Sequence, residues 1–443
     1  MTVRRDDLAS WGRTPRATPK RVLAMPWSGQ APVWNAHDAP MLAYGCGRSY
    51  GDVCLNNGGT IIRTSAMSLV QAFDVDYGVI RAEAGITLEQ LLRCTIPRGW
   101  FLPVVPGTRY VTIGGAVAND IHGKNHHRRG TFGCHVRRFE LLRSDGTRCV
   151  CSPTEHVDLF RTTIGGLGLT GIITWVEIQL IPITSTSVNV DRVKVRSLDE
   201  AMDVLEESDE SHEYTVTWID TTASERQTGR GHVIRGNHAH DGACSIDSIS
   251  RPPRITIPIE APEWLLHRST VGVFNTLYHQ RQQARHRRFV SDIVPFFWPL
   301  DAIGSWNRLY GARGMLQYQV VVPLSERHVI RTILVELRRA GIVSFLGVLK
   351  TFGSISSPGI MSFPRPGITL SLDLANQGAA KLRLFDKLDS LVIDAGGALY
   401  PAKDSRMSAA TFRASFPGLT TFRQHLDPAF SSTFWRRVTQ EPL

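Results

Sequence analysis

The chain has 443 residues, 42% of them hydrophobic and 20% charged, with a formal net charge of +10. These values are typical of a globular protein with two domains or of one large two-lobed enzyme, and no apolar run approaches the roughly 20 residues of a membrane-spanning helix. The positive charge predicts an anionic partner such as a phosphate or an acidic membrane face. A nucleic acid is not expected, because no nucleic-acid recognition motif accompanies the charge.

Short apolar strands separated by glycine turns are predicted in the first part of the chain, at 41–44, 60–62 and 79–85. Thr87 and Gln90 then have the spacing of a capping box and predict the start of a helix. Its inward face would carry Leu88, Leu91 and Leu92.

A hairpin and a long strand follow. Asp145-Gly146 is a strong turn signal between the apolar runs 139–142 and 148–150, and 170–180 reads as a strand with partial alternation. After Pro182 the pattern predicts a helix over 197–205, where Ser197 and Glu200 have the spacing of a capping box, and a strand over 214–220. It predicts a further strand at 317–323, a basic amphipathic helix at 326–340 and a strand within 363–374. This order predicts an α+β protein with a cofactor lobe first and a sheet-plus-helix lobe second.

The segment 107–127 carries the most chemical information. It holds four glycines, three histidines and a lysine around the apolar run 116–118. Glycine lets the backbone approach a flat or anionic ligand, and a buried segment this polar needs a partner. Taken alone, it allows a flavin, a phosphate or a metal. A metal is disfavoured, because Gly123 and Gly130 argue against a helix that would align His122 with His126, and no carboxylate has zincin spacing.

Two more glycine clusters lie at 45–52 and 165–171. The first does not match a dinucleotide fingerprint, because its third glycine is one place late and no helix pattern follows. It can be an anion-binding loop or a plain turn. Lys403 lies in a short polar turn, where a surface lysine is the default interpretation.

The basic stretch 278–288 allows two interpretations: a solvated loop, or a surface that attracts lipid phosphates near a substrate entrance. The seven cysteines lack paired zinc spacing, so we expect reduced thiols. The charged stretch 1–7 lacks the apolar core of an export signal. We therefore expect a cytoplasmic protein, with peripheral association at the inner face of the membrane as an option.

These segments resemble the vanillyl-alcohol-oxidase superfamily of flavoproteins and, within it, the family of decaprenylphosphoryl-β-D-ribose 2-oxidases. The segments 122–127 and 402–406 are specific to that family, whereas the glycine clusters are shared by the superfamily. The matching segments run in order through nearly the whole chain: 10–14, 47–52, 107–109, 120–127, 306–308, 316–319, Lys350 with Phe352, and 402–406.

The resemblance implies an α+β fold with a split PCMH-type FAD-binding domain. Its first part would span 1–184, and a substrate-binding domain with an antiparallel sheet would span 185–397. Residues 398–443 would then return to the FAD-binding domain. Relatives that tether the flavin use a histidine where this chain has Arg48, so we expect non-covalent FAD and no metal.

The glycine loops then acquire an expected role, because backbone N–H groups can hold the FAD pyrophosphate without a metal. Tyr400 is expected to close over the flavin. The residues expected to bind the cofactor are Gly45, Gly47, Arg48, Ser49, Tyr50, Gly51, Gly107, Thr112, Ile113, Gly114, Gly115, Asn119, Asp120, His122, Gly123, Asn125, Ile172 and Tyr400.

The activity that the resemblance implies is oxidation of the 2-hydroxyl of a polyprenyl-phosphoryl ribose to a keto group. This is the first half of an epimerisation to arabinose, for a cell-wall arabinan or another arabinose product. A separate NAD(P)H-dependent keto-reductase would complete it. Lys403, His122 and Tyr50 are the expected catalytic residues. The residues expected to bind substrate are Trp218, Phe297, Asn307, Gln317, Gln319, Lys350, Phe352, Ser371 and Lys403.

The chain departs from the family at two positions, because Ser371 and Thr369 stand where relatives commonly have cysteine and asparagine. Hydride transfer does not need that cysteine, so we still expect the same class of reaction. The exact sugar and lipid of the substrate are not determined by the sequence. One alternative is an FAD-dependent oxidase of free sugars, alditols or aldonolactones that uses oxygen. Another is a basic binding protein that retains the flavin fold without turnover.

Overall fold

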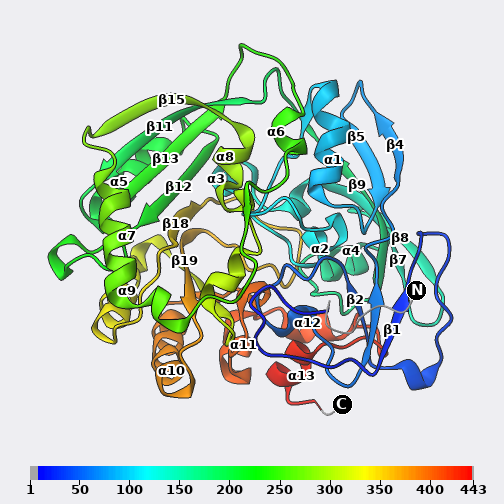
Figure 1. Ribbon diagram of the computed structural model, residues 1–443. Coiled ribbons are helices and arrows are strands. Elements are labelled where there is room, and N and C mark those ends of the chain that lie inside the picture. The colour runs from blue at the N-terminus through cyan, green and yellow to red at the C-terminus, as the bar shows by residue number, and fades with distance from the viewer. Residues whose placement is uncertain (1–7, 442–443) are drawn as a thin grey trace.

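The structure is a computed structural model that describes residues 8–441, and the charged stretch 1–7 lies outside the described residues. Two lobes lie side by side, and the C-terminal helices α11 (Ala409–Ser415), α12 (Leu419–Arg423) and α13 (Thr433–Thr439) lie below and between them (Figure 1). No helix among the described residues is long and apolar enough to span a membrane. All seven cysteines are free thiols, as expected.

The first lobe contains a small parallel sheet and a larger antiparallel one. The small sheet has the order β1 (Arg21–Ala24), β3 (Thr60–Arg63), β2 (Met41–Tyr44). The larger sheet has the order β4 (Val70–Asp74), β5 (Val79–Glu83), β9 (Ile172–Gln179), β7 (Val136–Leu142), β8 (Arg148–Cys151). The predicted strands and the hairpin at Asp145-Gly146 are confirmed, with Gly146 at φ 86° in the turn.

Local sequence signals explain the helices of this lobe. Thr87 and Gln90 form the predicted capping box at the start of α1 (Leu88–Thr95), and Leu88, Leu91 and Leu92 are fully buried. Thr112 caps α2 (Ile113–Ala118) by accepting from the Gly115 N–H. The apolar run of the glycine-rich segment is therefore a short helix, whose residues Ala116 and Val117 are buried in the core. Two further helices are α3 (His126–Arg129) and α4 (Val157–Thr163).

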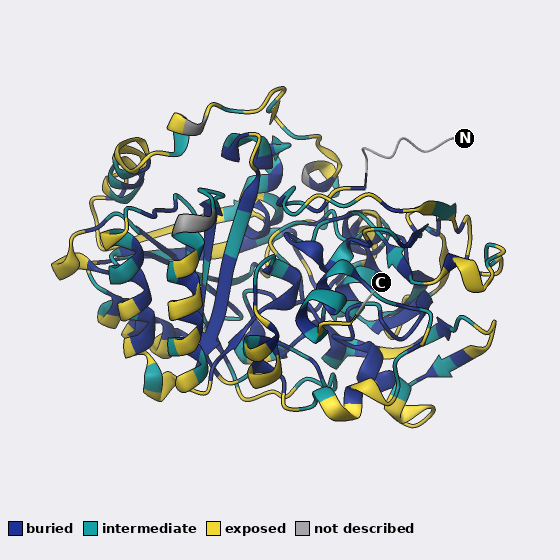
Figure 2. Cartoon of the chain, turned by 90° about the horizontal axis from the view of Figure 1, so that it is seen from below, coloured by how far each residue is buried: buried dark blue, intermediate teal, exposed yellow. Residues whose placement is uncertain are grey.

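The second lobe is built on an eight-stranded sheet, antiparallel at every pairing. Its strand order is β15 (His286–Asp292), β11 (Ser187–Val195), β13 (Gly231–His238), β12 (Tyr214–Ile219), β18 (Gly347–Phe352), β19 (Gly367–Ala375), β17 (Met315–Val322), β20 (Ala398–Leu399). The helices α5 (Leu198–Ser208), α9 (His328–Arg339) and α10 (Ala379–Asp394) contribute to one apolar core with its strands. Their outer faces are exposed, and the strands beneath them are buried (Figure 2).

The predicted elements of this lobe are confirmed, with one difference at the start of α5. Ser197 caps the helix by accepting from the Glu200 N–H, but the Glu200 carboxylate accepts from the Arg196 N–H and does not complete a capping box.

The basic stretch 278–288 is not the loop that one interpretation predicted. Helix α7 (Arg268–Gln280) runs through its first residues and β15 begins at His286, so only a short turn separates them. The side chain of Gln282 is buried in that turn, and its amide donates to the carbonyls of Arg192, Ala284 and Arg285. These hydrogen bonds hold the turn against β11, whereas the neighbouring arginines are exposed.

The C-terminal residues connect the two lobes. β20 pairs with β17 of the eight-stranded sheet, and the chain then passes through α11 and α12 to α13. On α13, Arg437 forms ion pairs with Asp52 of the first lobe at 2.8 Å and with Asp404 at 3.0 Å. The return therefore starts within the eight-stranded sheet. The domain boundaries at 184 and 397 stay a prediction.

Candidate active site

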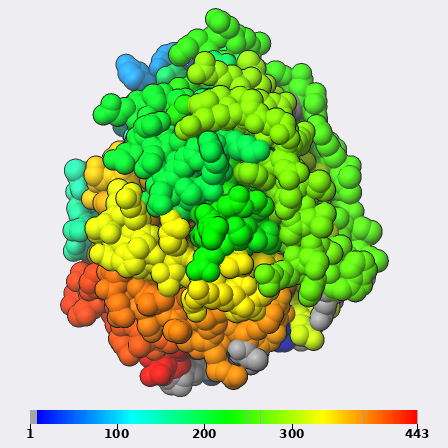
Figure 3. All heavy atoms as spheres, turned by 90° about the vertical axis from the view of Figure 1, so that its left-hand side faces the viewer, coloured from blue at the N-terminus to red at the C-terminus, as the bar shows by residue number. Residues whose placement is uncertain are grey.

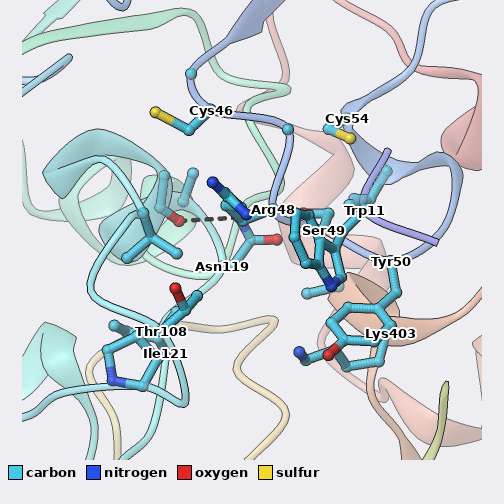
Figure 4. Close-up of a pocket in the computed structure, with 18 of the residues that line it drawn as sticks. Trp11, Cys46, Arg48, Ser49, Tyr50, Cys54, Thr108, Asn119, Ile121 and Lys403 are labelled. Carbon is cyan, nitrogen blue, oxygen red and sulfur yellow. Dashed lines mark hydrogen bonds between the residues drawn. The ribbon is translucent and has the colours of Figure 1, made fainter. Parts of the chain in front are cut away.

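A cavity of about 320 Å³ lies where the glycine loops, the eight-stranded sheet and the C-terminal return meet. It brings together residues that are far apart in the sequence (Figure 4). The predicted site residues that line it are Gly45, Gly47, Arg48, Ser49, Tyr50, Gly107, Thr112, Gly114, Gly115, Asn119, His122, Gln317, Gln319, Lys350, Ser371, Tyr400 and Lys403.

The loop 45–51 is held between α2 and the C-terminal return. A Cβ at Gly45 would lie 2.5 Å from the Thr112 hydroxyl, and Gly47 has φ +59°, so both positions require glycine. The Tyr50 N–H donates to the Ala402 carbonyl at 2.9 Å. A Cβ at Gly51 would overlap the Asp404 carbonyl oxygen, so Gly51 packs against the return rather than against the cavity.

The glycines of the second loop leave open space in the cavity. A Cβ at Gly107 would meet nothing within 4 Å, and one at Gly115 would meet only the Thr112 hydroxyl, at 3.0 Å. Nearby, Arg48 Nε and Asn119 Oδ1 are buried and have no hydrogen-bond partner within the described chain. Buried polar atoms are rarely left unpaired. A polar ligand with a flat ring system that touches the backbone fits this arrangement, and FAD is such a ligand.

Arg48 lies at the centre of the cavity's cofactor side. Its guanidinium lies 4.3 Å from the ring centre of Trp11, and Figure 4 shows it beside Ser49 and Asn119. Opposite, the Tyr400 hydroxyl donates to the Asn119 carbonyl at 3.0 Å, which fixes Tyr400 against the loop after α2.

His122 is the centre of a buried hydrogen-bond network. Its Nε2 lies 2.9 Å from Gln319 Nε2, and its Nδ1 lies 3.1 Å from Lys350 Nζ. Burial and the charge of Lys350 hold the pKa of His122 well below its usual range, so the ring is neutral. A neutral imidazole has one N–H and one acceptor nitrogen, so only one of these two partners can donate to it.

Lys350 is suited to the accepting role in that network. Burial and the charges of Lys124 and Lys403 lower its pKa to about 7, which leaves much of the amine neutral at physiological pH. Gln319 can then donate to the ring, and its amide also lies 3.3 Å from the hydroxyl of Thr369, one of the two positions that depart from the family.

His122 and His126 do not converge on a common point. Their ring centres lie 4.8 and 4.4 Å from that of Phe352, so both rings pack on the same aromatic side chain. Among the residues that the structure describes, no group of three histidine, cysteine or acidic side chains is placed to hold a metal ion.

Lys403 lies at the end of a short 3₁₀ helix (Pro401–Lys403), and its Nζ is 3.8 Å from the ring centre of Tyr50 (Figure 4). Burial lowers the pKa of Lys403 to about 8, while the charge of Asp373 opposes that shift. Asp373 lies on β19, where the Gln317 amide of β17 donates to it. Burial raises the pKa of Asp373 to about 6, which leaves it mostly ionised at pH 7.

The sequence did not single out Asp373. The available signal was a carboxylate between Leu372 and Leu374 in strand β19, where an unpaired buried charge is costly. It also missed several further residues of the cavity wall. These are Trp11, Cys46, Thr108, Leu300, Trp306, Leu346 and Val348.

Several predicted cofactor residues lie behind the cavity rather than on its wall. Ile113 and Ile172 are fully buried in the core, and the Gly123 carbonyl accepts from Lys350. Asp120 accepts from the Gly133 N–H and from the hydroxyls of Ser357 and Ser362. The Asn125 amide donates to the Pro103 carbonyl at 2.8 Å. These residues shape the loops, and direct contacts to a cofactor stay a prediction for them.

Four predicted substrate residues also lie outside the cavity wall. The Trp218 indole donates to the Phe345 carbonyl, and Phe297 is fully buried with its ring 4.7 Å from that of Tyr214. The Asn307 amide donates to the Trp11 carbonyl at 2.8 Å, and its neighbour Trp306 lines the cavity instead. Phe352 packs behind His122.

Residues 32–152 match the FAD binding domain family. Together with the cavity, this match defines the protein as an FAD-dependent oxidoreductase, with the α+β fold that the sequence predicted. The chain is 36% identical over 411 residues to decaprenylphosphoryl-β-D-ribose oxidase of Mycolicibacterium smegmatis, covering 90% of this chain and 89% of that protein. The chain belongs to the decaprenylphosphoryl-β-D-ribose oxidase family.

Two further relatives put this match in context. An uncharacterized protein of Streptomyces coelicolor is 34% identical over 371 residues, which cover 80% of this chain and 100% of that protein. A putative D-arabinono-1,4-lactone oxidase of Neurospora crassa is 30% identical over 138 residues, 31% of this chain and 24% of that protein. The similarity to lactone oxidases is therefore confined to a part of the chain.

Proposed function

We propose that this protein oxidises the 2-hydroxyl of a polyprenyl-phosphoryl ribose to a keto group, the first half of an epimerisation to arabinose. The observation that carries the proposal is the near full-length identity to the M. smegmatis oxidase, combined with a cavity that joins the flavin loops to Lys403, Lys350 and His122. A separate NAD(P)H-dependent reductase would return the keto group to an alcohol.

FAD, when bound, supplies the acceptor for the hydride that leaves the sugar C2. The chain would hold it without a covalent bond, because Arg48 stands where relatives that tether the flavin have a histidine. Lys403 stands next to Tyr50 of the first loop, where its amine can take the proton of the reacting hydroxyl. Lys350 on β18 and Gln317 on β17 line the cavity from the two strands that flank β19, and they would bind oxygens of the phosphate and the sugar.

The Asp373→Asn variant is expected to move the pH dependence of flavin reduction. Lys403 accepts a proton only as a neutral amine, so the rate should rise with pH through about 8. The Asp373 carboxylate favours the protonated amine, so its loss lowers the pKa of Lys403 and moves the rise by roughly one unit to lower pH. Stopped-flow reduction between pH 6 and 10 measures this shift. The control variant Asp394→Asn, at an exposed position, should leave the pH profile unchanged. An unchanged profile in Asp373→Asn would show that Asp373 does not influence the pKa of Lys403.

Anaerobic bleaching of the flavin tests the proposed substrate directly. We expect rapid bleaching by polyprenyl-phosphoryl ribose, and none by free ribose or alditols at equal concentration. Rapid hydrogen peroxide formation from a free alditol or an aldonolactone, without turnover of the lipid-linked sugar, would establish the oxygen-using oxidase instead.

We also propose that the protein works in the cytoplasm, at the inner face of the membrane. The net charge of +10 and the exposed arginines of α7 and β15 support attraction to anionic lipid.

A further inference from the structure

Helix α7 and the segment before it carry an exposed apolar surface. Six of the sixteen large apolar side chains that are exposed within residues 8–441 lie between 255 and 277. We call them the α7 patch: Ile255, Ile259, Trp264, Val273, Phe274 and Leu277, which are 48% to 74% exposed. The surrounding segment, green to lime in Figure 3, covers the right-hand part of the face shown there. Large apolar side chains that are exposed together along one segment point to an interaction site.

Polar contacts fix the orientation of α7. On its inner side, Val271 is buried, and the Asn275 amide donates to Asp220 Oδ1 at 3.0 Å and to the Ser344 carbonyl at 3.1 Å. Val273 and Leu277, four residues apart, therefore share the outer face of the helix. A surface helix normally presents polar side chains there, whereas α7 exposes Val273, Phe274 and Leu277.

The α7 patch adjoins the end of the cavity proposed to bind substrate. The Phe274 ring lies 5.9 Å from that of Phe345, whose neighbour Leu346 lines the cavity. The loop before α7 is held to the 3₁₀ helix Trp306–Tyr310, because the Ala261 N–H donates to the Arg308 carbonyl at 2.9 Å. Trp306, from that same 3₁₀ helix, lines the cavity.

Positive charge accompanies the patch along the same segment of the chain. Residues 251–292 contain seven arginines against three acidic residues. Arg251, Arg254, Arg268 and Arg281 are exposed, and none forms an ion pair within the described part of the chain. Apolar side chains flanked by free arginines complement an anionic lipid surface, whose headgroups attract the arginines while its acyl region accepts the apolar groups.

We propose that the α7 patch docks the enzyme on an anionic phospholipid bilayer, so that the substrate end of the cavity faces the membrane. A polyprenyl tail can then stay in lipid while the phosphoryl sugar enters the cavity. This docking assigns the membrane attachment proposed above to one surface, and the link to the substrate rests on the proposed function.

Vesicle sedimentation with the FAD-loaded, full-length protein tests the docking. We expect binding to equimolar phosphatidylglycerol–phosphatidylcholine vesicles, weak binding to pure phosphatidylcholine, and loss of binding in high salt. The triple variant Trp264→Ser, Val273→Ser, Leu277→Ser should lower the partition coefficient by at least about tenfold. Arg281→Glu should lower it by at least about fivefold, because each basic residue near an anionic surface has roughly that effect.

A matched variant in the first lobe controls for general surface apolarity. Val33→Ser, Leu69→Ser, Tyr77→Ser removes three side chains that are 88%, 62% and 74% exposed, and it should bind vesicles like the unaltered protein. Flavin absorbance and Tm establish that each variant is folded. Equal vesicle binding by both triple variants, or none by the unaltered protein, would refute lipid docking. If only the α7 variant converts a dimer to a monomer while vesicle binding is unchanged, the α7 patch is an interface between two copies of the chain and lipid docking is refuted.

Activity separates the docking from the proposed reaction. The α7 variant should reduce its flavin at the normal rate with a short-chain, water-soluble prenyl-phosphoryl ribose, yet slow about tenfold or more with long-chain substrate in vesicles. Failure of the unaltered protein with both substrates would refute the reaction, while the sedimentation result would still decide the docking.

Discussion

Lys403→Ala is expected to lower the rate of flavin reduction by about 10²–10⁴-fold, the usual contribution of a positioned acid or base. FAD should remain bound, because the variant removes no backbone contact of the glycine loops. The amine that is lost lies 3.8 Å from the Tyr50 ring centre, and its pKa of about 8 leaves a usable neutral fraction near physiological pH. Anaerobic stopped-flow spectroscopy measures the rate, and the flavin spectrum measures occupancy.

Two further variants test whether the effect is specific to Lys403 and whether its amine acts as a base. Lys387→Ala removes an exposed lysine of α10 and should reduce flavin normally. Lys403→Arg keeps a positive charge but cannot act as a base near neutral pH, so it should be as slow as Lys403→Ala. A fast Lys403→Arg enzyme would mean that Lys403 stabilises charge without accepting the proton, and a fast Lys403→Ala enzyme would remove Lys403 from the chemistry.

Gly115→Val is expected to weaken FAD binding by roughly 10- to 100-fold, the effect of an overpacked site. At Gly115 a Cβ meets only the Thr112 hydroxyl, at 3.0 Å, so the added atoms would project into the cavity rather than into the protein. The ratio of flavin to protein absorbance after purification, followed by titration with FAD, measures the loss.

The control for this variant is Gly272→Val. Gly272 lies in α7, and a Cβ there has no neighbour closer than 3.9 Å. It should keep full cofactor occupancy, and after removal of FAD the two variants should unfold at the same temperature, because bound FAD itself stabilises the folded state. A fully loaded Gly115→Val protein would show that the loop 107–115 does not contact the cofactor.

Local signals in the sequence were sufficient for much of the fold. The capping box at Thr87, the turn at Asp145-Gly146 and the strand around Trp218 depend on residues that are neighbours in the chain. The resemblance to the family added Lys403, which the polar turn alone would have left as a surface lysine. The contact between Asp373 and Gln317 could not be predicted, because the two residues belong to different strands and only the pairing of β17 with β19 brings them together.

The sequence carried least information on which residues near the cavity form its wall and which lie behind it. Asn307 and Trp306 are adjacent in sequence, but only the tryptophan lines the cavity while the asparagine holds the Trp11 carbonyl. Ile172 and Ile173 differ in the same way, because alternate residues of β9 face opposite sides. A motif locates two adjacent residues near the cavity, but it does not show which of their side chains faces the cavity.

The C-terminal return also determines when the enzyme can acquire its cofactor during synthesis. The first loop depends on the Ala402 carbonyl and on Arg437, and these residues leave the ribosome after both large sheets. Domains generally fold in the order in which they emerge, yet here Tyr50 and Asp52 of the first lobe must wait for Ala402, 352 positions later, and for Arg437, 385 positions later, before these contacts can form. Nascent chains arrested before residue 398 should therefore be apoproteins, and cofactor capture becomes a late event of assembly.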